Sequence, residues 1–175
     1  VDSLVNSLRD KSLKAARVLE KDYEPFKSTL KEWYQAGSPQ INDYWLRRIA
    51  KSRSKVHSDE LLTLESDILI LDRSMFTTAV YQKEFADPVN VVEMNMNYGV
   101  QMPEYVFFLE CSPWLSLRRV FNREKDFPHF IPDLEYFESA HSRFREIASR
   151  MRNVHIINTE ETNTEEVVNY IKAII

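Results

Sequence analysis

The sequence predicts a layered α/β domain in which helices cover a parallel sheet. Two observations support this prediction. Short apolar runs bounded by charged residues occur at 67–71 and 104–109, and such runs are typical of strands buried in a parallel sheet. Amphipathic helical patterns alternate with these runs along the chain. Because the chain has 175 residues and 43% of them are hydrophobic, we expect one globular domain over 1–175.

The first part of the chain shows helical spacing on both sides of a short apolar run. Leu4, Val5 and Leu8 follow a 3.6-residue period, and Pro25 and Gly37 interrupt regular structure farther along. The elements expected here are a helix at 1–13, a short strand at 15–19, a helix at 26–33, one long or two shorter helices at 41–64 and a strand at 67–71.

Helix-start residues mark the second part of the chain. Proline suits the first turn of a helix, and Asp87-Pro88 and Ser112-Pro113 supply it twice. The elements expected here are helical structure at 75–98 with a break at Asp87-Pro88, a strand at 104–109, a helix from Ser112-Pro113 to about Arg123, a helix at 134–151, a strand at 154–158 and a helix at 164–175.

Composition and charge argue against several classes of protein. The formal net charge of −4 does not suit a protein that grips nucleic acid by its phosphates, because such proteins carry a basic surface. No segment is apolar over the length that a bilayer requires, so no membrane association is expected. The single cysteine, Cys111, can form no internal disulfide, and no signal-peptide pattern opens the chain. We therefore expect a cytoplasmic protein.

The low glycine content restricts how the chain could bind a nucleotide. Gly37 and Gly99 are its only glycines, whereas average usage would give about a dozen. GxGxxG needs three glycines, and GxxxxGK[ST] needs two that lie close together, so Gly37 and Gly99 can form neither of these phosphate-cradling motifs. The chain also begins at Val1 within a helical pattern, so we expect further residues to precede Val1 in the natural protein.

Charged residues directly after a buried strand are the first candidates for a site. Ligands bind at the carboxyl ends of strands in open α/β sheets, and Asp72 and Arg73 follow the run at 67–71. An acid there can hold Mg²⁺, and the adjacent guanidinium can neutralise phosphoryl oxygens during transfer. The alternative is that Asp72 and Arg73 only begin the next helix.

A second group of basic residues ends the helix that follows the strand at 104–109. Arg119 and Arg123 lie four residues apart and would share a helix face, so they could clamp a polyphosphate. The alternative is a solvated basic face that balances neighbouring acids. Composition and spacing leave both interpretations open.

The segment Leu71-Asp72-Arg73-Ser74-Met75-Phe76-Thr77-Thr78-Ala79-Val80-Tyr81-Gln82 resembles the signature of the thymidylate kinases. In that signature an Asp-Arg-aromatic triplet at a strand end precedes Ser/Thr and then Ala-Tyr-Gln. The segments at 103–109, 117–123, 134–148 and 154–158 are similar, in the same order, to the strands and helices that follow the signature in this family.

The resemblance implies a three-layer P-loop NTPase-type fold and ATP-dependent phosphoryl transfer to a nucleoside monophosphate, with dTMP converted to dTDP. It implies that Asp72 helps to hold Mg²⁺, directly or through water, and that Arg73 contacts the phosphates of donor and acceptor. Arg119 and Arg123 would act from a mobile lid, expected at 119–133, that closes over ATP.

Four further residues are implied to contact the acceptor nucleotide. Thr77, Tyr81 and Gln82 belong to the signature itself, and Arg53 occupies the place of an acceptor-binding arginine in the family. The resemblance also implies a possible homodimer.

Departures from the family pattern keep two alternatives open. Ser74 replaces the aromatic of the triplet, which favours a deoxynucleoside kinase, and Asn158 replaces an aspartate in the last strand. The Arg-Glu-Pro-Gly acceptor loop is not recognisable. The missing phosphate-binding loop suggests either a catalytically inactive nucleotide-binding or regulatory protein, or a first strand and P-loop that precede Val1; we favour the latter.

Overall fold

The structure is a computed structural model of the 175-residue chain. It describes every residue except 11, 38–42, 82–86 and 124–132. The chain forms two compact units, Val1–Pro103 and Glu104–Ile175, and each unit is described by itself below.

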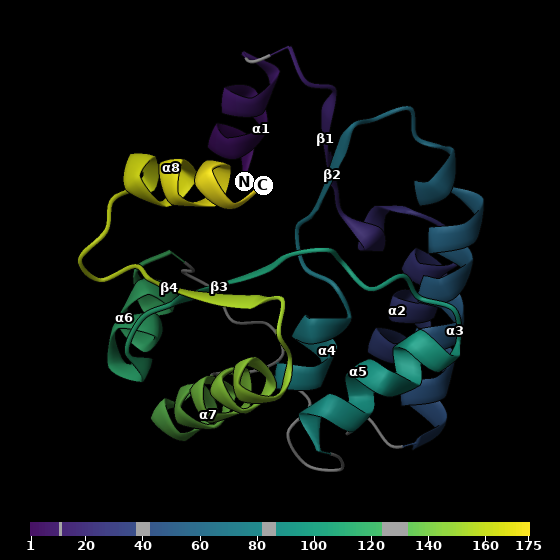
Figure 1. Ribbon diagram of the computed structural model, residues 1–175. Helices are drawn as coiled ribbons and strands as arrows, with labels where there is room; N and C mark the ends of the chain where they lie inside the picture. The colour runs from purple at the N-terminus through teal and green to yellow at the C-terminus, as the bar shows by residue number, and fades with distance from the viewer. Residues whose placement is uncertain (11, 38–42, 82–86, 124–132) are drawn as a thin grey trace. The chain divides into compact units, whose positions relative to one another are not determined.

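The first unit contains the parallel strand pair that the sequence predicts. Strand β1 (Ala15–Val18) pairs with β2 (Ile68–Leu71), with Ala15 opposite Ile68 and Val18 opposite Leu71 (Figure 1). The parallel direction requires a long connection between the strands, and helices supply it. The predicted strands at 15–19 and 67–71 are therefore confirmed to within one residue at each end.

Helices pack beside this strand pair and form an apolar core with it. Helix α1 packs on β1, α2 on α3, and α5 packs against both α3 and α4. Val18, Val56, Val80 and Val92 are among the fully buried side chains of this core. The helical elements of the unit are α1 (Asp2–Arg9), η1 (Glu20–Asp22), α2 (Phe26–Gln35), α3 (Asp43–Asp59), η2 (Leu61–Thr63), α4 (Met75–Tyr81) and α5 (Pro88–Asn97).

The predicted helix break at Asp87-Pro88 is the start of α5. The Asp87 side chain accepts a hydrogen bond from Val89 N at 2.8 Å, and Pro88 occupies the first turn of the helix. Proline is tolerated there because the first backbone N–H groups of a helix have no partner within it.

The second unit repeats the same design with two strands and three helices. Strand β3 (Val106–Glu110) pairs in parallel with β4 (Val154–Asn158). Helix α7 packs on β4 and α6, and Figure 1 shows α8 on the opposite side of the strand pair. The helices of this unit are α6 (Pro113–Arg123), α7 (Leu134–Arg150) and α8 (Thr164–Ile174). All five elements lie where the sequence predicts them.

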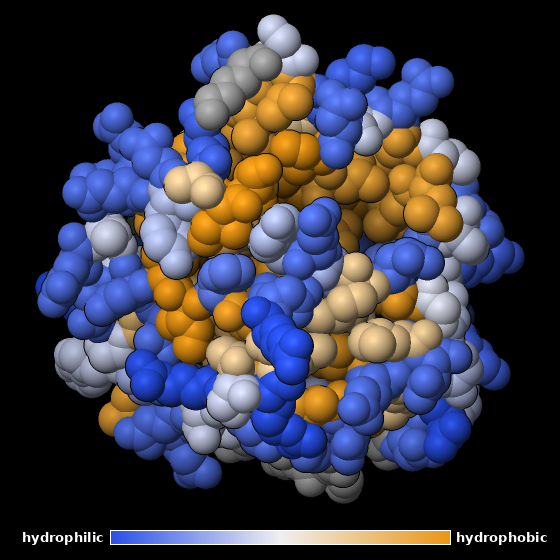
Figure 2. Space-filling view, in the orientation of Figure 1, coloured by the Kyte–Doolittle hydropathy of each residue, from blue (hydrophilic) through white to orange (hydrophobic). Residues whose placement is uncertain are grey.

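Strand β2 is less buried than its sequence suggests. The run Ile68–Leu71 is uniformly apolar, yet each of its four residues is only half-buried. Within the described part of the chain β1 is the one strand that pairs with β2, so the other edge of β2 is uncovered. On β3, Leu109 is likewise 59% exposed. Figure 2 shows apolar side chains reaching the surface among charged ones.

A bilayer-spanning helix would need about 20 consecutive apolar residues, and none of the helices in the described ranges meets that requirement.

The start of α8 provides a measurable test of the local structure. The Asn163 side chain accepts from Glu166 N at 3.0 Å, and the Glu166 carboxylate accepts from Asn163 N at 2.8 Å. This reciprocal cap satisfies two backbone donors. We predict that Asn163→Ala lowers the free energy of unfolding by about 1 kcal/mol, measured by urea denaturation.

The matched control is Asn169→Ala, the same change at an exposed position inside α8. Alanine favours a helix interior over asparagine, so this variant should gain about 0.5 kcal/mol. Equal losses in both variants would contradict the capping role.

Candidate active site

The candidate site begins where β2 ends. Asp72 N donates to Val18 O at 2.9 Å, which extends the β1–β2 pairing by one residue and fixes the Asp72 backbone. The next residue, Arg73, adopts φ 71°, in the left-handed region that residues other than glycine seldom enter. This conformation turns the chain sharply from the strand toward α4. Asp72 therefore stays in the sheet while Arg73 leaves it.

Arg73 combines backbone strain with an unengaged side chain. It is exposed, and its guanidinium has no hydrogen bond or ion pair with any described residue. A left-handed conformation costs an L-residue roughly 1–2 kcal/mol. Strain of this kind is concentrated at functional sites, where surrounding structure enforces it. The observation supports a role for Arg73 in binding something outside the folded chain.

The Asp72 carboxylate is engaged by an arginine that the sequence did not single out. Arg17 of β1 forms an ion pair with Asp72 Oδ2 through NH2, and its NH1 lies 3.0 Å from Asp2 Oδ1. The hydrogen bond to Asp72, together with the Asp2 carboxylate, raises the pKa of Arg17 above its usual value. No sequence motif marks Arg17, because the pairing depends on the register of β1 and β2.

The donor set at this site is compatible with Mg²⁺ bound to a nucleotide. Mg²⁺ keeps several waters and is commonly held by one or two carboxylates together with substrate phosphates. Asp72 supplies one carboxylate at the end of a strand, with 26% of its side chain exposed. Among the described residues no cluster of three or more metal-binding side chains occurs, so a cage made wholly of protein ligands is not present in that part.

Helix α4 carries the other predicted residues of the signature. Thr77 N donates to Ser74 O at 3.0 Å, which starts the helix directly after Arg73. Thr77 and Tyr81 lie four residues apart and are both half-buried, so they share a face of α4. Gln82 lies outside the described residues. The structure thus groups Asp72 and Arg73 with the start of α4, as the sequence predicted.

Arg53 lies in the core of the first unit, on α3. It is 2% exposed, and its Nε donates to Glu20 Oε2 at 2.7 Å. NH1 donates to Asn95 Oδ1 at 2.8 Å and NH2 to Thr78 Oγ1 at 3.2 Å. The guanidinium also lies over the Phe26 ring, 4.8 Å from its centroid. Arg53 therefore joins α3 to η1, α4 and α5.

A guanidinium has five N–H groups, and three of those of Arg53 have acceptors within the described residues. One N–H on NH1 and one on NH2 remain. The contact with Thr78 is only partly buried, so this end of the guanidinium is the one closest to solvent. The geometry leaves Arg53 able to donate to an anion that approaches from the side of α4.

Glu20 is the buried acid at the centre of this network. Its Oε1 lies 2.9 Å from His57 Nε2, and His57 Nδ1 accepts from Gln101 N at 3.2 Å. Because Nδ1 accepts a hydrogen bond, the ring proton of neutral His57 lies on Nε2. The Nε2–H group therefore donates a hydrogen bond to Glu20. Burial alone would raise the pKa of Glu20, but the Arg53 charge and the hydrogen bonds from His57 and Arg53 outweigh it and lower that pKa.

In the second unit, Arg119 is tied to the loop after β4. Its NH1 donates to Thr159 Oγ1 at 3.3 Å and its NH2 to Thr159 O at 3.1 Å. The backbone of Arg123 ends α6, and residues 124–132 of the predicted lid lie outside the described residues. The predicted pairing of Arg119 and Arg123 on a phosphate therefore remains a prediction.

The carboxyl ends of β3 and β4 hold a small polar pocket of about 190 Å³. Glu110 accepts from Arg145 Nε and NH2, both at 2.9 Å, and lies 3.0 Å from His141 Nε2. His141 and Arg145 are four residues apart on α7, a spacing that places both on the face toward Glu110. The sequence shows this spacing, but only the strand register reveals the acid that both contact.

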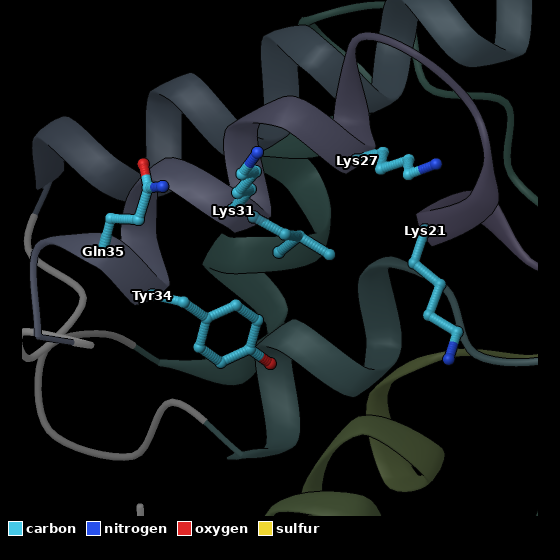
Figure 3. Close-up of a pocket in the computed structure, with 6 residues that line it drawn as sticks. Lys21, Lys27, Lys31, Tyr34 and Gln35 are labelled. Carbon is cyan, nitrogen blue, oxygen red and sulfur yellow. The ribbon is translucent and has the colours of Figure 1, made fainter.

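A larger basic pocket of about 420 Å³ lies on the first unit. Figure 3 shows Lys21, Lys27 and Lys31 around it together with the ring of Tyr34. None of these three ammonium groups forms an ion pair with a described residue, but they point in different directions and do not converge on one anion. Lys27, Lys31 and Tyr34 follow a helical spacing on α2 that the sequence shows, but no motif distinguishes it from an ordinary solvated face.

Parallel strands flanked by helices, with an acid and an arginine at a strand end, define an α/β protein with a site suited to phosphate groups. The sequence model of the family described as "Thymidylate kinase" matches residues 2–171. The chain therefore belongs to the thymidylate kinase family. The structure is similar to that of thymidylate kinase from Candida albicans, with a TM-score of 0.67 and 14% sequence identity. That match covers 99% of this chain and 84% of the other and shows the shared fold.

Among curated proteins, the chain is similar to the thymidylate kinases of two Leptospira species. It is 31% identical over 80 residues to the Leptospira interrogans protein. The aligned segment covers 45% of this chain and 39% of that protein. It is 31% identical over 78 residues to the Leptospira borgpetersenii enzyme, covering 43% and 38%. The aligned part thus spans less than half the length of these relatives.

The depressed pKa of Glu20 predicts how stability depends on pH. A carboxylate whose pKa is lower in the folded chain than in the unfolded chain stabilises the fold when the pH is above the unfolded pKa. This stabilisation is lost as the pH falls through the folded pKa. We predict that the free energy of unfolding declines below about pH 4.5 partly through Glu20. Glu20→Gln should be less stable than wild type at pH 7, and the gap should narrow below pH 4.

Urea titrations between pH 3 and pH 8 test this prediction. The control is Glu24→Gln, a change to an exposed acid whose carboxylate accepts a 3.2 Å hydrogen bond from Ser28 N. It should change stability by less than about 1 kcal/mol. A pH-independent gap between Glu20→Gln and wild type would contradict the role of the Glu20 charge.

The strained conformation of Arg73 predicts that one substitution there affects thermal stability and activity differently. Asparagine tolerates the left-handed region better than arginine does. We predict that Arg73→Asn keeps or slightly raises the melting temperature, while phosphoryl transfer falls by at least about 100-fold because a phosphate-neutralising donor is lost. Thermal denaturation and initial-rate assays measure the two effects.

Ser12 provides the control, since it is the other described non-glycine residue with positive φ, at 66°. Ser12→Asn should have a similar effect on melting temperature and leave the rate unchanged. Wild-type activity in the Arg73→Asn variant would contradict the assignment of Arg73 to the site.

Proposed function

We propose that this chain forms the body of an ATP-dependent nucleoside monophosphate kinase that transfers the γ-phosphoryl group of ATP to dTMP and yields dTDP. The observation that carries the proposal is the pair at the end of β2. Asp72 stays in the sheet, and Arg73 is held strained, exposed and without a partner among the described residues. The family membership of the chain supports the same chemistry.

Charge neutralisation is the main contribution expected from the site. Phosphoryl transfer needs little covalent chemistry from the protein, because positioning and electrostatic stabilisation lower most of the barrier. Arg73 would bind oxygens of the transferred group with its planar guanidinium. Asp72 would help to hold Mg²⁺, which would supply positive charge against the phosphate oxygens.

The acceptor would bind beside α4. Thr77, Tyr81 and Gln82 come from this helix or directly follow it, and Arg53 reaches the same helix through its contact with Thr78. The two N–H groups of Arg53 that have no acceptor among the described residues would bind the acceptor phosphate. The buried Glu20–Arg53 pair would keep that guanidinium in place during closure, because removing Arg53 from Glu20 leaves a buried charge unpaired.

Arg119 and Arg123 would contribute from the second unit, in a lid at 119–133 that closes over the donor and excludes water. The hydrogen bonds from Arg119 to Thr159 would anchor the base of such a lid to the loop after β4.

Two other functions are distinguishable by experiment. A deoxynucleoside kinase is favoured by Ser74, whose small side chain stands where the signature has an aromatic and whose Oγ lies 3.4 Å from Phe76 N. A nucleotide-binding protein without catalysis is the other candidate, because the 175 residues contain no glycine-rich phosphate loop.

The test measures ADP formation from ATP and Mg²⁺ by the protein expressed from its complete coding region. A panel of nucleosides and nucleoside monophosphates serves as acceptors, and we predict the highest kcat/KM for dTMP. A nucleoside that outcompetes its monophosphate would select the deoxynucleoside kinase. Failure to form ADP with every acceptor, combined with nucleotide binding, would select the inactive protein.

Matched variants at the two ends of β2 locate the activity. Asp72→Asn should lower kcat by at least about 100-fold, since the carboxylate charge is lost at the metal. Asp67→Asn makes the same change next to the opposite end of the strand, where the carboxylate accepts from Lys14 N at 2.8 Å. It should keep kcat within about twofold of wild type. Similar losses in both would indicate a structural effect on β2.

A further inference from the structure

The Asp72 carboxylate already has a cationic partner in this structure, because Arg17 pairs with one of its two oxygens. Arg17 NH2 forms an ion pair with Asp72 Oδ2. Both side chains are partly exposed, 35% for Arg17 and 26% for Asp72, so the pair lies at the surface of the site. An arginine and a divalent cation that share one carboxylate compete for it.

The register of the strands makes this contact a fixed feature of the fold. Arg17 lies opposite Ile70 in the parallel pair. Side chains two residues apart on a strand share a face, so Asp72 is the diagonal neighbour of Arg17 on that face. The bond from Asp72 N to Val18 O keeps the two backbones at this spacing. The long arginine side chain therefore reaches Asp72 without any change in the sheet.

A second carboxylate offers Arg17 another partner. Arg17 NH1 lies 3.0 Å from Asp2 Oδ1 and 3.3 Å from Asp2 Oδ2, in the first turn of α1. One guanidinium thus bridges the start of α1 and the end of β2. If the contact with Asp72 is lost, Arg17 keeps an anionic partner within reach, so its charge stays compensated.

We infer that Arg17 is an internal counter-ion that holds the Asp72 carboxylate until a divalent cation replaces it, and that Asp2 then retains the guanidinium. This inference rests on the proposed role of Asp72 at the metal. Arg17 is accordingly a positioning residue: it acts on the metal through Asp72. Competition from Arg17 would lower the affinity of Asp72 for the metal, and the contact with Asp2 would reduce that competition.

The inference predicts that substitutions of Arg17 and Asp2 change the affinity for the metal in opposite directions. Arg17→Met removes the competitor and should tighten metal binding, while Asp2→Asn leaves Arg17 with Asp72 alone and should weaken it. Exposed ion pairs shift an equilibrium constant by up to about fivefold, so changes of about twofold to fivefold are expected in each direction. In the Arg17→Met background, Asp2→Asn should have a smaller effect than in the wild type.

The experiment titrates the complete protein with Mn²⁺ in the presence of ADP and measures free Mn²⁺ by electron paramagnetic resonance. This readout does not depend on turnover. Asp72→Asn defines the part of the binding that belongs to Asp72. Arg47→Met is the matched control, since Arg47 forms an exposed pair with Asp43 on α3 and the change removes the same charge. Its Mn²⁺ dissociation constant should equal that of the wild type.

Several outcomes would overturn the inference. If Arg17 only connects α1 to the sheet, Arg17→Met and Asp2→Asn should both lower the melting temperature. Neither variant should then change the Mn²⁺ dissociation constant. Weaker Mn²⁺ binding by Arg17→Met would show that Arg17 supports the metal rather than competing with it. Binding that Asp72→Asn leaves intact would place the metal elsewhere and remove the basis for the exchange.

Failure of the proposed function gives a different result. If the complete protein forms no ADP with any acceptor but Arg17→Met tightens Mn²⁺ binding through Asp72, the counter-ion role stands and the kinase activity does not. If ADP forms and the Arg17 and Asp2 variants bind Mn²⁺ as the wild type does, the kinase stands and the counter-ion role falls.

Discussion

The first unit depends on the buried pair of Glu20 and Arg53. Both side chains are almost completely excluded from solvent, and an uncompensated charge in that position would be strongly destabilising. The pair is completed by His57 and Asn95, so the carboxylate and the guanidinium are bound from several elements at once. Among the described residues, no buried side-chain nitrogen or oxygen lacks a hydrogen-bond partner. The network therefore specifies one arrangement of η1, α3, α4 and α5.

This network is connected to the site at the end of β2. The network reaches α4 through Thr78, and α4 begins two residues after Arg73. Arg73 lies in the turn between β2 and α4 and adopts the left-handed φ of 71° there. Elsewhere such strain would be removed by a glycine, whereas here it presents a guanidinium that no described residue engages. Packing in the core thus supports a chemical role at the surface.

Charge is distributed differently at the two ends of the site. Asp72 is paired with Arg17, whereas no described residue engages the Arg73 guanidinium. A chain with a formal net charge of −4 therefore carries a local region suited to phosphates. Net charge describes the chain as a whole and gives no information about such a local site.

Local sequence determined the elements of this protein and the candidate residues at the end of β2. The periodicity of 134–151, the proline at position 88 and the apolar run before Asp72 each predict structure because helix and strand formation respond to neighbouring residues. The order of strands and helices, with the Asp72 to Gln82 signature, was enough to predict the α/β fold and the family.

Tertiary structure alone decided the partners of those residues. Arg17 reaches Asp72 across 55 positions of the chain, and Glu20 reaches Arg53 across 33, through strand register and helix packing that no local pattern encodes. For the same reason, β2 is half-buried although its sequence is that of a fully buried strand, since burial depends on which strands pair at its edges. The candidate residues Asp72 and Arg73 are therefore visible in the sequence, whereas Arg17 and the contacts of Asp72 follow from the pairing of distant segments.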